Sequence, residues 1–247
     1  MQKIIEATIM TEKNKKNGIK QRQPVWKCVA GVLKLFFKKP KIISLSGELP
    51  NKAIYLANHS AMFGPLMYNL YLPAETSAWG AYPMLGNYRE RYRYLKNVYF
   101  IQKRHKSRFS ATVLAFFEAF FAPFFYRNMR VLPSYNDTRF ITTIRQSVQM
   151  LDNGVSVIIY PEDSNGGYHE QLTNFFAGFV ELAKYYYRKH REDIPIYPVY
   201  YHPKKRTMVI GQPQYLHDYL NQGLNRKQIA KEFCTQVNNL FLHHIKE

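Results

Sequence analysis

Cysteine is scarce in this chain of 247 residues, which contains two, Cys28 and Cys234. The two lie far apart in the sequence, form no C-x-x-C pair and have no histidines nearby. That arrangement argues against a zinc site and is typical of reduced thiols in a protein that faces the cytosol. We therefore expect no disulfide framework, no metal site and no covalent cofactor.

Acidic residues are also few: 17 Asp or Glu stand against 35 Lys or Arg, which gives a net charge of +18. The first fifty residues carry much of this excess, with eleven Lys or Arg and three Glu. Such a surface attracts nucleic acid, anionic lipid headgroups, phosphorylated cofactors or an acidic carrier protein. Charge alone does not choose among these partners.

Long apolar runs are the third feature that is missing. A bilayer span takes about 20 apolar residues, and the strongly apolar stretch 110–125 falls short of that length and contains Glu118 and Pro123. We expect this stretch to dip into a membrane or to be buried, and not to span. The N-terminus also lacks the basic flank, apolar core and small-residue cleavage site of a secretory signal.

The length of the chain suits one domain with an appended segment. Residues 1–24 are polar and rich in Lys, Asn and Gln, so we expect a mobile basic arm. Residues 25–40 predict an amphipathic helix that Pro40 ends, and residues 41–247 the α/β domain. The helix fits a membrane interface and ordinary packing on the domain equally well. Its apolar residues recur every three or four positions among lysines: Trp26, Val29, Val32, Leu33, Phe36 and Phe37.

Strand-like and helix-like segments alternate along the domain. Apolar runs predict strands at 42–46, 53–57, 155–160, 194–201 and 208–210. Periodic patterns predict one helix starting near Pro65, one capped by Asp137, one capped by Thr173 and one starting near Asn225. The segment 79–106, rich in Tyr and Arg, receives no assignment. This alternation predicts an α/β fold with a central, mostly parallel twisted sheet flanked by helices.

Polar residues follow two of the predicted strands at the point where each strand ends. Asn58-His59-Ser60 comes after the strand 53–57, and Pro161-Glu162-Asp163-Ser164 comes directly after the strand 155–160. The carboxyl ends of parallel strands form one edge of an α/β sheet, which is where such proteins place their functional groups. We therefore expect the two polar segments to lie together.

Four segments in register resemble the glycerolipid acyltransferases, typified by 1-acylglycerol-3-phosphate acyltransferase, over about residues 42–202. They are Asn58-His59, Tyr160-Pro161-Glu162, the segment from Phe176-Ala177-Gly178 to Leu182-Ala183, and Pro195-Ile196-Tyr197-Pro198-Val199. In that family a histidine removes the proton of an acceptor hydroxyl, whose oxygen attacks an acyl thioester. The resemblance implies that His59 is this base, a role that suits a group titrating near neutral pH.

The chain departs from the family pattern at two positions. Gly64 stands where the family has an aspartate that orients the histidine, and Asn165 stands where it has an arginine that contacts the acceptor phosphate. Glu162, Asp163, or backbone and water contacts could orient His59 instead; otherwise the site binds lipid without turnover. Losing the guanidinium removes bidentate phosphate recognition, which favours an acceptor other than a glycerol phosphate. The family's second block is approximated by residues 130–135.

The predicted function is transfer of a fatty acyl group from acyl-CoA or acyl-carrier protein to a hydroxyl of a lipid or lipid precursor, at the cytoplasmic face of the cell membrane. The alternatives are a catalytically inactive lipid-binding protein of the same fold and, third, a nucleic-acid-binding protein, although no nucleic-acid-binding motif is present. The expected catalytic residues are His59, Glu162 and Asp163, and the expected substrate-binding residues are Asn58, Ser60, Gly64, Tyr160, Pro161, Ser164, Asn165, Gly166 and Gly178.

Overall fold

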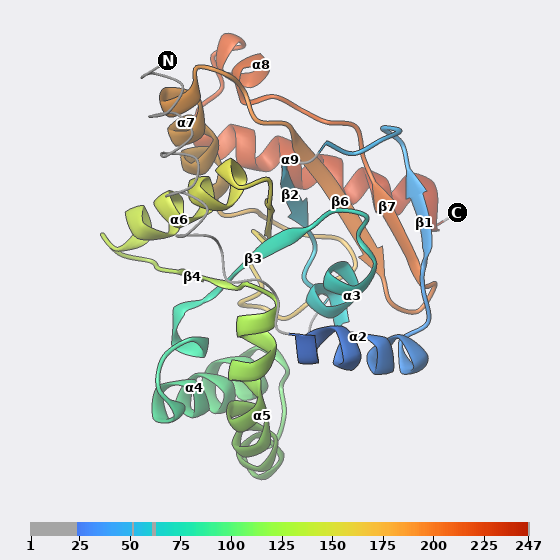
Figure 1. Cartoon of the computed structure of the whole chain (residues 1–247), viewed down its shortest axis with the longest axis vertical. Helices are drawn as coiled ribbons and strands as arrows, with labels where there is room; N and C mark the ends of the chain where they lie inside the picture. Colours follow the sequence, from blue (N-terminus) through green and yellow to red (C-terminus); the bar gives the residue numbers. More distant parts are fainter. Residues whose placement is uncertain (1–23, 51, 61–62, 247) are drawn as a thin grey trace, which may run out of the picture.

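The computed structural model describes residues 24–50, 52–60 and 63–246. Within these residues, seven strands form one sheet in the order β1-β7-β6-β2-β5-β3-β4 (Figure 1). All neighbouring strands are parallel except β6 and β7, which form an antiparallel hairpin. The predicted mostly parallel sheet is therefore confirmed. The strands are β1 Lys41–Ser44, β2 Ile54–Ala57, β3 Thr76–Ala81, β4 Leu132–Ser134, β5 Ser156–Ile159, β6 Ile196–His202 and β7 Thr207–Ile210.

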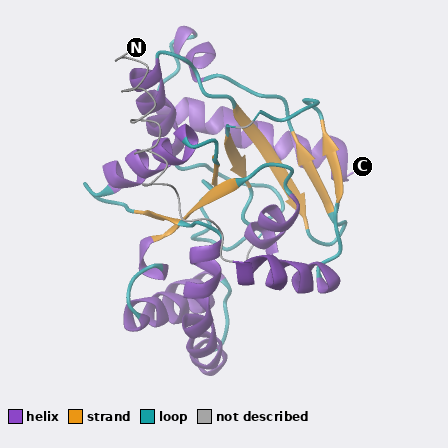
Figure 2. Ribbon diagram, viewed as in Figure 1, coloured by secondary structure: helices purple, strands orange, loops and turns teal. Residues whose placement is uncertain are grey.

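Helices cover both faces of the sheet, as Figure 2 shows. One face packs against α6 (Phe140–Asp152), α7 (Gly178–His190), α8 (Leu216–Asn221) and α9 (Arg226–Phe241), which η3 (Leu242–Lys246) extends. The opposite face packs against α3 (Phe63–Tyr71), and Phe37, just after α2 (Pro24–Phe36), contacts the same cluster. The central strands β2, β5 and β6 are buried along their whole length, which explains why they lack the polar alternation of a half-exposed sheet.

A separate group of helices extends from the edge of the sheet that carries β3 and β4 (Figure 1). It consists of η1 (Tyr82–Met84), α4 (Tyr88–Tyr94), the π-helix η2 (Leu95–Lys103) and α5 (Arg108–Asn128), and it has its own apolar cluster. We call these elements the helical lobe. The segment 79–106 that received no assignment thus forms the end of β3 and most of the lobe, and the apolar stretch 110–125 belongs to the lobe as well.

Helix α5 is longer than the apolar stretch 110–125 suggested. It has 21 residues and is long and apolar enough by length and composition to cross a membrane, and 22% of its most apolar part is buried. The helix therefore lies mostly at the surface and does not fill the core. The predicted arm 1–24 lies outside the described residues apart from Pro24, with which α2 begins.

Two predicted helix caps are wrong. The Asp137 carboxylate accepts hydrogen bonds from the backbone and guanidinium of Arg139, and α6 starts after Arg139. The segment after Thr173 stays extended because Phe175 pairs with Glu162 in a β-bridge, so α7 begins only at Gly178. The helix start predicted near Asn225 is correct: α9 begins at Arg226, and Asn225 and Gln228 form a reciprocal capping box there.

Candidate active site

The two polar segments that follow β2 and β5 meet at the carboxyl edge of the sheet, as predicted. Strand β2 pairs with β5, and Leu56 lies opposite Ile159. The chain leaves these strands at Asn58-His59 and at Tyr160-Pro161-Glu162. There the backbone N–H of His59 donates to Glu162 Oε2 at 3.1 Å. A contact between residues 103 positions apart thus joins the two segments.

The imidazole of His59 lies between two tyrosine rings. The Tyr168 ring stacks on it at a centroid distance of 5.2 Å and an interplanar angle of 24°. The Tyr160 ring meets it at 5.2 Å with an angle of 71°. Two such contacts restrict rotation of the imidazole and orient it. Tyr168 had no predicted role, although it lies in the polar segment that follows β5.

Asn58 and Ser60 hold the backbone around His59. Asn58 Oδ1 accepts from Tyr68 Oη at 2.7 Å and from the backbone N–H of Tyr201 at 2.8 Å. Asn58 Nδ2 donates to Ser60 Oγ at 2.6 Å and to the Tyr201 carbonyl at 3.0 Å, and Ser60 Oγ donates to the same carbonyl at 3.0 Å. These bonds use the full capacity of the Asn58 amide. Both side chains therefore tie the end of β2 to β6.

Gly64 fits tightly against the backbone that carries His59. A Cβ at this position would lie 2.1 Å from the carbonyl oxygen of His59 and 3.3 Å from that of Asn58. Any side chain would require the start of α3 to move. The packing of α3 against this backbone therefore leaves no room for an aspartate at position 64.

Glu162 is the buried carboxylate of the site, with 8% of its surface exposed. Burial raises the pKa of this carboxyl to about 7, and the His59 N–H and the charge of Lys103 oppose that rise. Its second oxygen, Oε1, has no hydrogen-bond partner in the part of the chain that the structure describes. A carboxyl with this pKa changes its charge near neutral pH, which is typical of functional sites.

Lys103 reaches the site from the end of η2 in the helical lobe. Its Nζ donates to Ser164 Oγ at 2.8 Å, and Ser164 is 7% exposed. Burial lowers the pKa of this lysine, whereas the charges of Glu162 and Asp163 raise it. Lys103 belongs to no recognisable motif, because it is one of many basic residues in a segment without periodicity. The lobe thus supplies a cation to the loop after β5.

The remaining residues of that loop have other partners. The Asp163 carboxylate accepts from the backbone N–H of Asn165 at 3.1 Å, and the Asp163 N–H donates to the carbonyl of Asn174 at 3.0 Å. Asn165 and Gly166 are exposed to solvent. Of the two carboxylates expected to orient the base, Glu162 is therefore the one that bonds to His59.

Two further predicted residues shape the chain around the site. The Pro161 carbonyl accepts from the backbone N–H of Phe176 at 2.7 Å. A Cβ on Gly178 would lie 3.1 Å from Phe140 and 3.4 Å from Trp79. Gly178 thus allows α7 to pack closely on α6 and β3.

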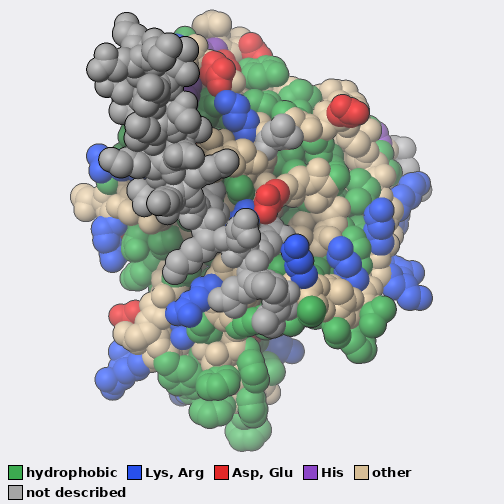
Figure 3. Space-filling model, in the orientation of Figure 1, with side chains coloured by type: hydrophobic (Ala, Val, Ile, Leu, Met, Phe, Trp, Pro, Cys, Tyr) green, Lys and Arg blue, Asp and Glu red, His purple; other side chains and the backbone are tan. Residues whose placement is uncertain are grey.

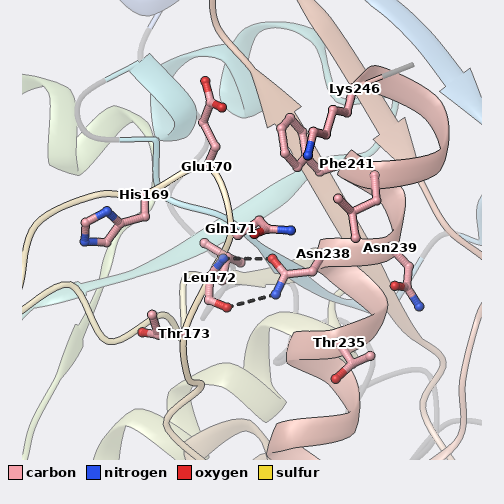
Figure 4. A pocket seen from close by; sticks show the side chains of 11 residues that line it. His169, Glu170, Gln171, Leu172, Thr173, Thr235, Asn238, Asn239, Phe241 and Lys246 are labelled. Atoms are coloured by element: carbon pink, nitrogen blue, oxygen red, sulfur yellow. Dashed lines mark hydrogen bonds between the residues drawn. The ribbon is translucent and has the colours of Figure 1, made fainter.

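A cavity of about 700 Å³ lies between residues 169–173, in the middle of the loop that joins β5 to α7, and the C-terminal helices (Figure 4). Asn238 of α9 bridges its wall, accepting from the Leu172 N–H and donating to the Leu172 carbonyl, both at 2.8 Å. His59 and Glu162 do not line this cavity. Within residues 24–50, 52–60 and 63–246, no group of three His, Cys, Asp or Glu side chains is arranged to hold a metal ion.

The fold and the site define an α/β protein whose parallel strands present a histidine and a buried glutamate at their carboxyl edge. No protein-family model matches the chain, and no protein of curated function matches it. Among solved structures, the chain is similar to the 1-acyl-sn-glycerophosphate (LPA) acyltransferase PlsC from Thermotoga maritima. The two share 11% sequence identity over 88% of this chain and 78% of that chain, with a TM-score of 0.47.

Proposed function

We propose that this protein transfers a fatty acyl group from acyl-CoA or acyl-carrier protein to a hydroxyl of a lipid or lipid precursor. The observation that carries the proposal is the contact between the His59 backbone and Glu162, which brings together the first and second of the four segments that resemble the glycerolipid acyltransferases. The imidazole is oriented by two tyrosine rings, and the backbone of the same residue bonds to a buried carboxylate, an arrangement that suits general-base chemistry. No metal or covalent cofactor takes part in this proposal.

The proposed reaction uses His59 to move one proton. The imidazole takes the proton of the acceptor hydroxyl while the oxygen attacks the thioester carbonyl, and the carbon–sulfur bond then breaks. The imidazolium returns the proton to the departing sulfur, so the products are an ester and a free thiol. The negative charge of ionised Glu162 stabilises the imidazolium that forms between these two proton transfers. Glu162 thereby takes the role that the resemblance gives to an aspartate at position 64, where this chain has glycine.

Lys103 and Ser164 are the groups proposed to bind the polar part of a substrate. A lysine ammonium is a compact point charge, and it binds phosphate without the fixed bidentate geometry of an arginine. Asn165 supplies no such charge. We therefore infer an acceptor that is not recognised through a glycerol phosphate, and we assign Lys103 to an anionic group of the donor or acceptor.

A lipid acceptor implies a location at a membrane. We propose peripheral or monotopic attachment to the cytoplasmic face, with anionic lipids and an acidic donor as partners of the basic surface. Nucleic acid is not a proposed partner.

The test is release of free thiol from long-chain acyl-CoA and from acyl-carrier protein, with lysophospholipid, glycerol phosphate and non-phosphorylated lipid acceptors. Wild type is compared with His59→Ala and with His244→Ala, which removes an exposed histidine of η3. Acceptor-dependent release that is lost only in His59→Ala supports the transferase, and preference for a non-phosphorylated acceptor supports the role given to Asn165.

The second candidate is a lipid-binding protein without turnover, and the observation that favours it is the lack of room for a carboxylate at position 64. No thiol release by wild type with either donor and any acceptor would overturn the transferase. Lipid binding that His59→Ala leaves unchanged would then support the second candidate.

A further inference from the structure

Helix α5 buries its small side chains and exposes its large ones. Its alanines face the other helices of the lobe and are 0–4% exposed, whereas Phe120 is 70% exposed and Phe109 is 80% exposed. A helix on a water-soluble surface shows the opposite pattern, because large apolar side chains gain most from burial. We call the exposed side the phenylalanine face. It consists of Phe109, Val113, Leu114, Phe116, Phe117, Phe120 and Phe121.

Helix α2 adds to this apolar surface. Trp26 is buried and packs against Phe124 and Phe125 of α5, at ring centroid distances of 6.2 Å and 6.0 Å. Farther along α2, Leu35 and Phe36 are each 77% exposed. Hydrophobic side chains gather at the lower end of the molecule in Figure 3, where Figure 1 shows α5. Apolar patches of this kind on a soluble chain mark an interaction surface.

The charge around these helices is strongly positive. Residues 82–128 contain nine Lys or Arg and two Glu, and residues 24–41 contain five Lys and no acid. The two segments therefore carry +12 of the net charge of +18. Apolar side chains flanked by basic ones match a bilayer that contains anionic headgroups, because the rings enter the acyl region and the cations stay at the surface.

The packing of α5 argues against a transmembrane orientation. Arg91 of α4 is buried, and its guanidinium donates to the carbonyl of Ala119 in α5 at 2.8 Å and to that of Gly86 at 2.7 Å. This arginine fixes α4 along the alanine side of α5. If α5 crossed the bilayer, it would carry Arg91 and the exposed Arg89 and Arg93 of α4 into the hydrocarbon, which is costly.

We propose that the phenylalanine face of α5, together with the exposed end of α2, inserts into one leaflet of a membrane that contains anionic lipid, without crossing it. The inserted lobe is the one whose Lys103 bonds to Ser164, so docking brings the membrane surface to the loop of the active site. This proposal deepens the membrane location given above and rests on it, but its test needs no turnover.

The experiment measures co-flotation with vesicles of phosphatidylcholine and phosphatidylglycerol in a 3:1 mixture. The double variant Phe116→Ser/Phe120→Ser is compared with wild type and with Ile141→Ser/Tyr215→Ser, which changes exposed apolar residues of α6 and of the position before α8. We expect the α5 variant to lose at least about tenfold in vesicle partitioning and the control variant to bind as wild type does. Vesicles of phosphatidylcholine alone should bind wild type more weakly.

Retained binding by the α5 variant would overturn the proposal. The proposal would also be overturned if wild type did not bind vesicles but formed dimers, and the α5 variant were monomeric. A second copy of the chain would then cover the phenylalanine face. Failure of the acyl-transfer proposal is distinguishable, since His59→Ala should bind vesicles normally.

Crossing is tested with Ser107→Cys in a Cys28→Ser background, which removes an exposed thiol. Position 107 lies at the start of α5. A membrane-impermeant maleimide should label it on vesicle-bound protein, more slowly than on free protein because the neighbouring Phe109 is inserted. Complete protection of position 107 by vesicles would overturn the single-leaflet orientation.

Discussion

Gly64 and His59 lie so close that no side chain fits between them: a Cβ on Gly64 would stand 2.1 Å from the carbonyl oxygen of His59. The loop that presents the base and the first turn of α3 are thus packed backbone to backbone. An aspartate at position 64 would have to push α3 away from the loop. The backbone can follow this course only because residue 64 is a glycine and has no side chain.

The first prediction concerns substitution of this glycine. Gly64→Asp should lower the free energy of unfolding by about 3 kcal/mol or more, because overpacking against backbone cannot be relieved by a rotamer change. It should also fail to raise turnover. The measurement is urea denaturation alongside the acyl-transfer assay. Gly31→Ala is the control, since nothing lies within 4 Å of its added Cβ on α2. A Gly64→Asp variant as stable as wild type would contradict the packing.

The second prediction concerns the pH dependence of stability through Glu162. Its pKa is raised by burial from an ordinary value of 4.5 to about 7, so between these values the folded protein binds more protons than the unfolded chain. The free energy of unfolding therefore falls as pH rises from 4.5 to 7, by roughly 3 kcal/mol, and levels off above pH 7.

Glu162→Gln removes this titration, so subtracting its unfolding curve from that of wild type isolates the effect. Denaturant titrations between pH 4.5 and 8.5 give the difference. The variant should gain stability relative to wild type as pH rises, and it should lose turnover because no carboxylate stabilises the imidazolium. Parallel curves for the two proteins would show that Glu162 does not titrate in this range.

The third prediction couples the helical lobe to the site through Lys103. The charge of Lys103 lowers the pKa of Glu162, so Lys103→Met should move the pKa of that carboxyl above 7. The pH range over which the free energy of unfolding falls should then extend to higher pH. Lys106→Met is the control, because it removes an exposed cation of the loop before α5. If both variants shift this pH range equally, the effect reflects overall charge and not Lys103.

Sequence patterns anticipate the elements on which the site is built but not its contacts. Buried strands followed by polar residues were sufficient to predict that His59 and Glu162 meet. Lys103 was not assigned, because its contact with Ser164 across 61 positions starts in an aperiodic segment and leaves no local pattern. Tyr168 was not assigned either, because its ring contact with His59 is equally non-local. The Thr173 cap was wrong for a related reason: the bridge between Phe175 and Glu162 overrides the local helix signal.

The fourth prediction concerns the ring that stacks on His59. The Tyr168 ring lies at 24° to the imidazole, so the aromatic surface is what limits imidazole rotation. Tyr168→Phe keeps that surface and should retain most of the turnover. Tyr168→Ala removes it and should lower kcat between about 10- and 100-fold with a smaller effect on KM, because orientation matters in the transition state. Initial-rate kinetics at saturating donor provide the two constants.

A purely structural role for Tyr168 would give a different result. If the ring served only the fold, Tyr168→Ala would lower the free energy of unfolding while the folded fraction kept its kcat. If its hydroxyl mattered instead, Tyr168→Phe would be as impaired as Tyr168→Ala. Loss of kcat in the alanine variant alone, in protein that remains folded, is the outcome expected when the ring acts by holding the imidazole in the orientation needed for proton transfer.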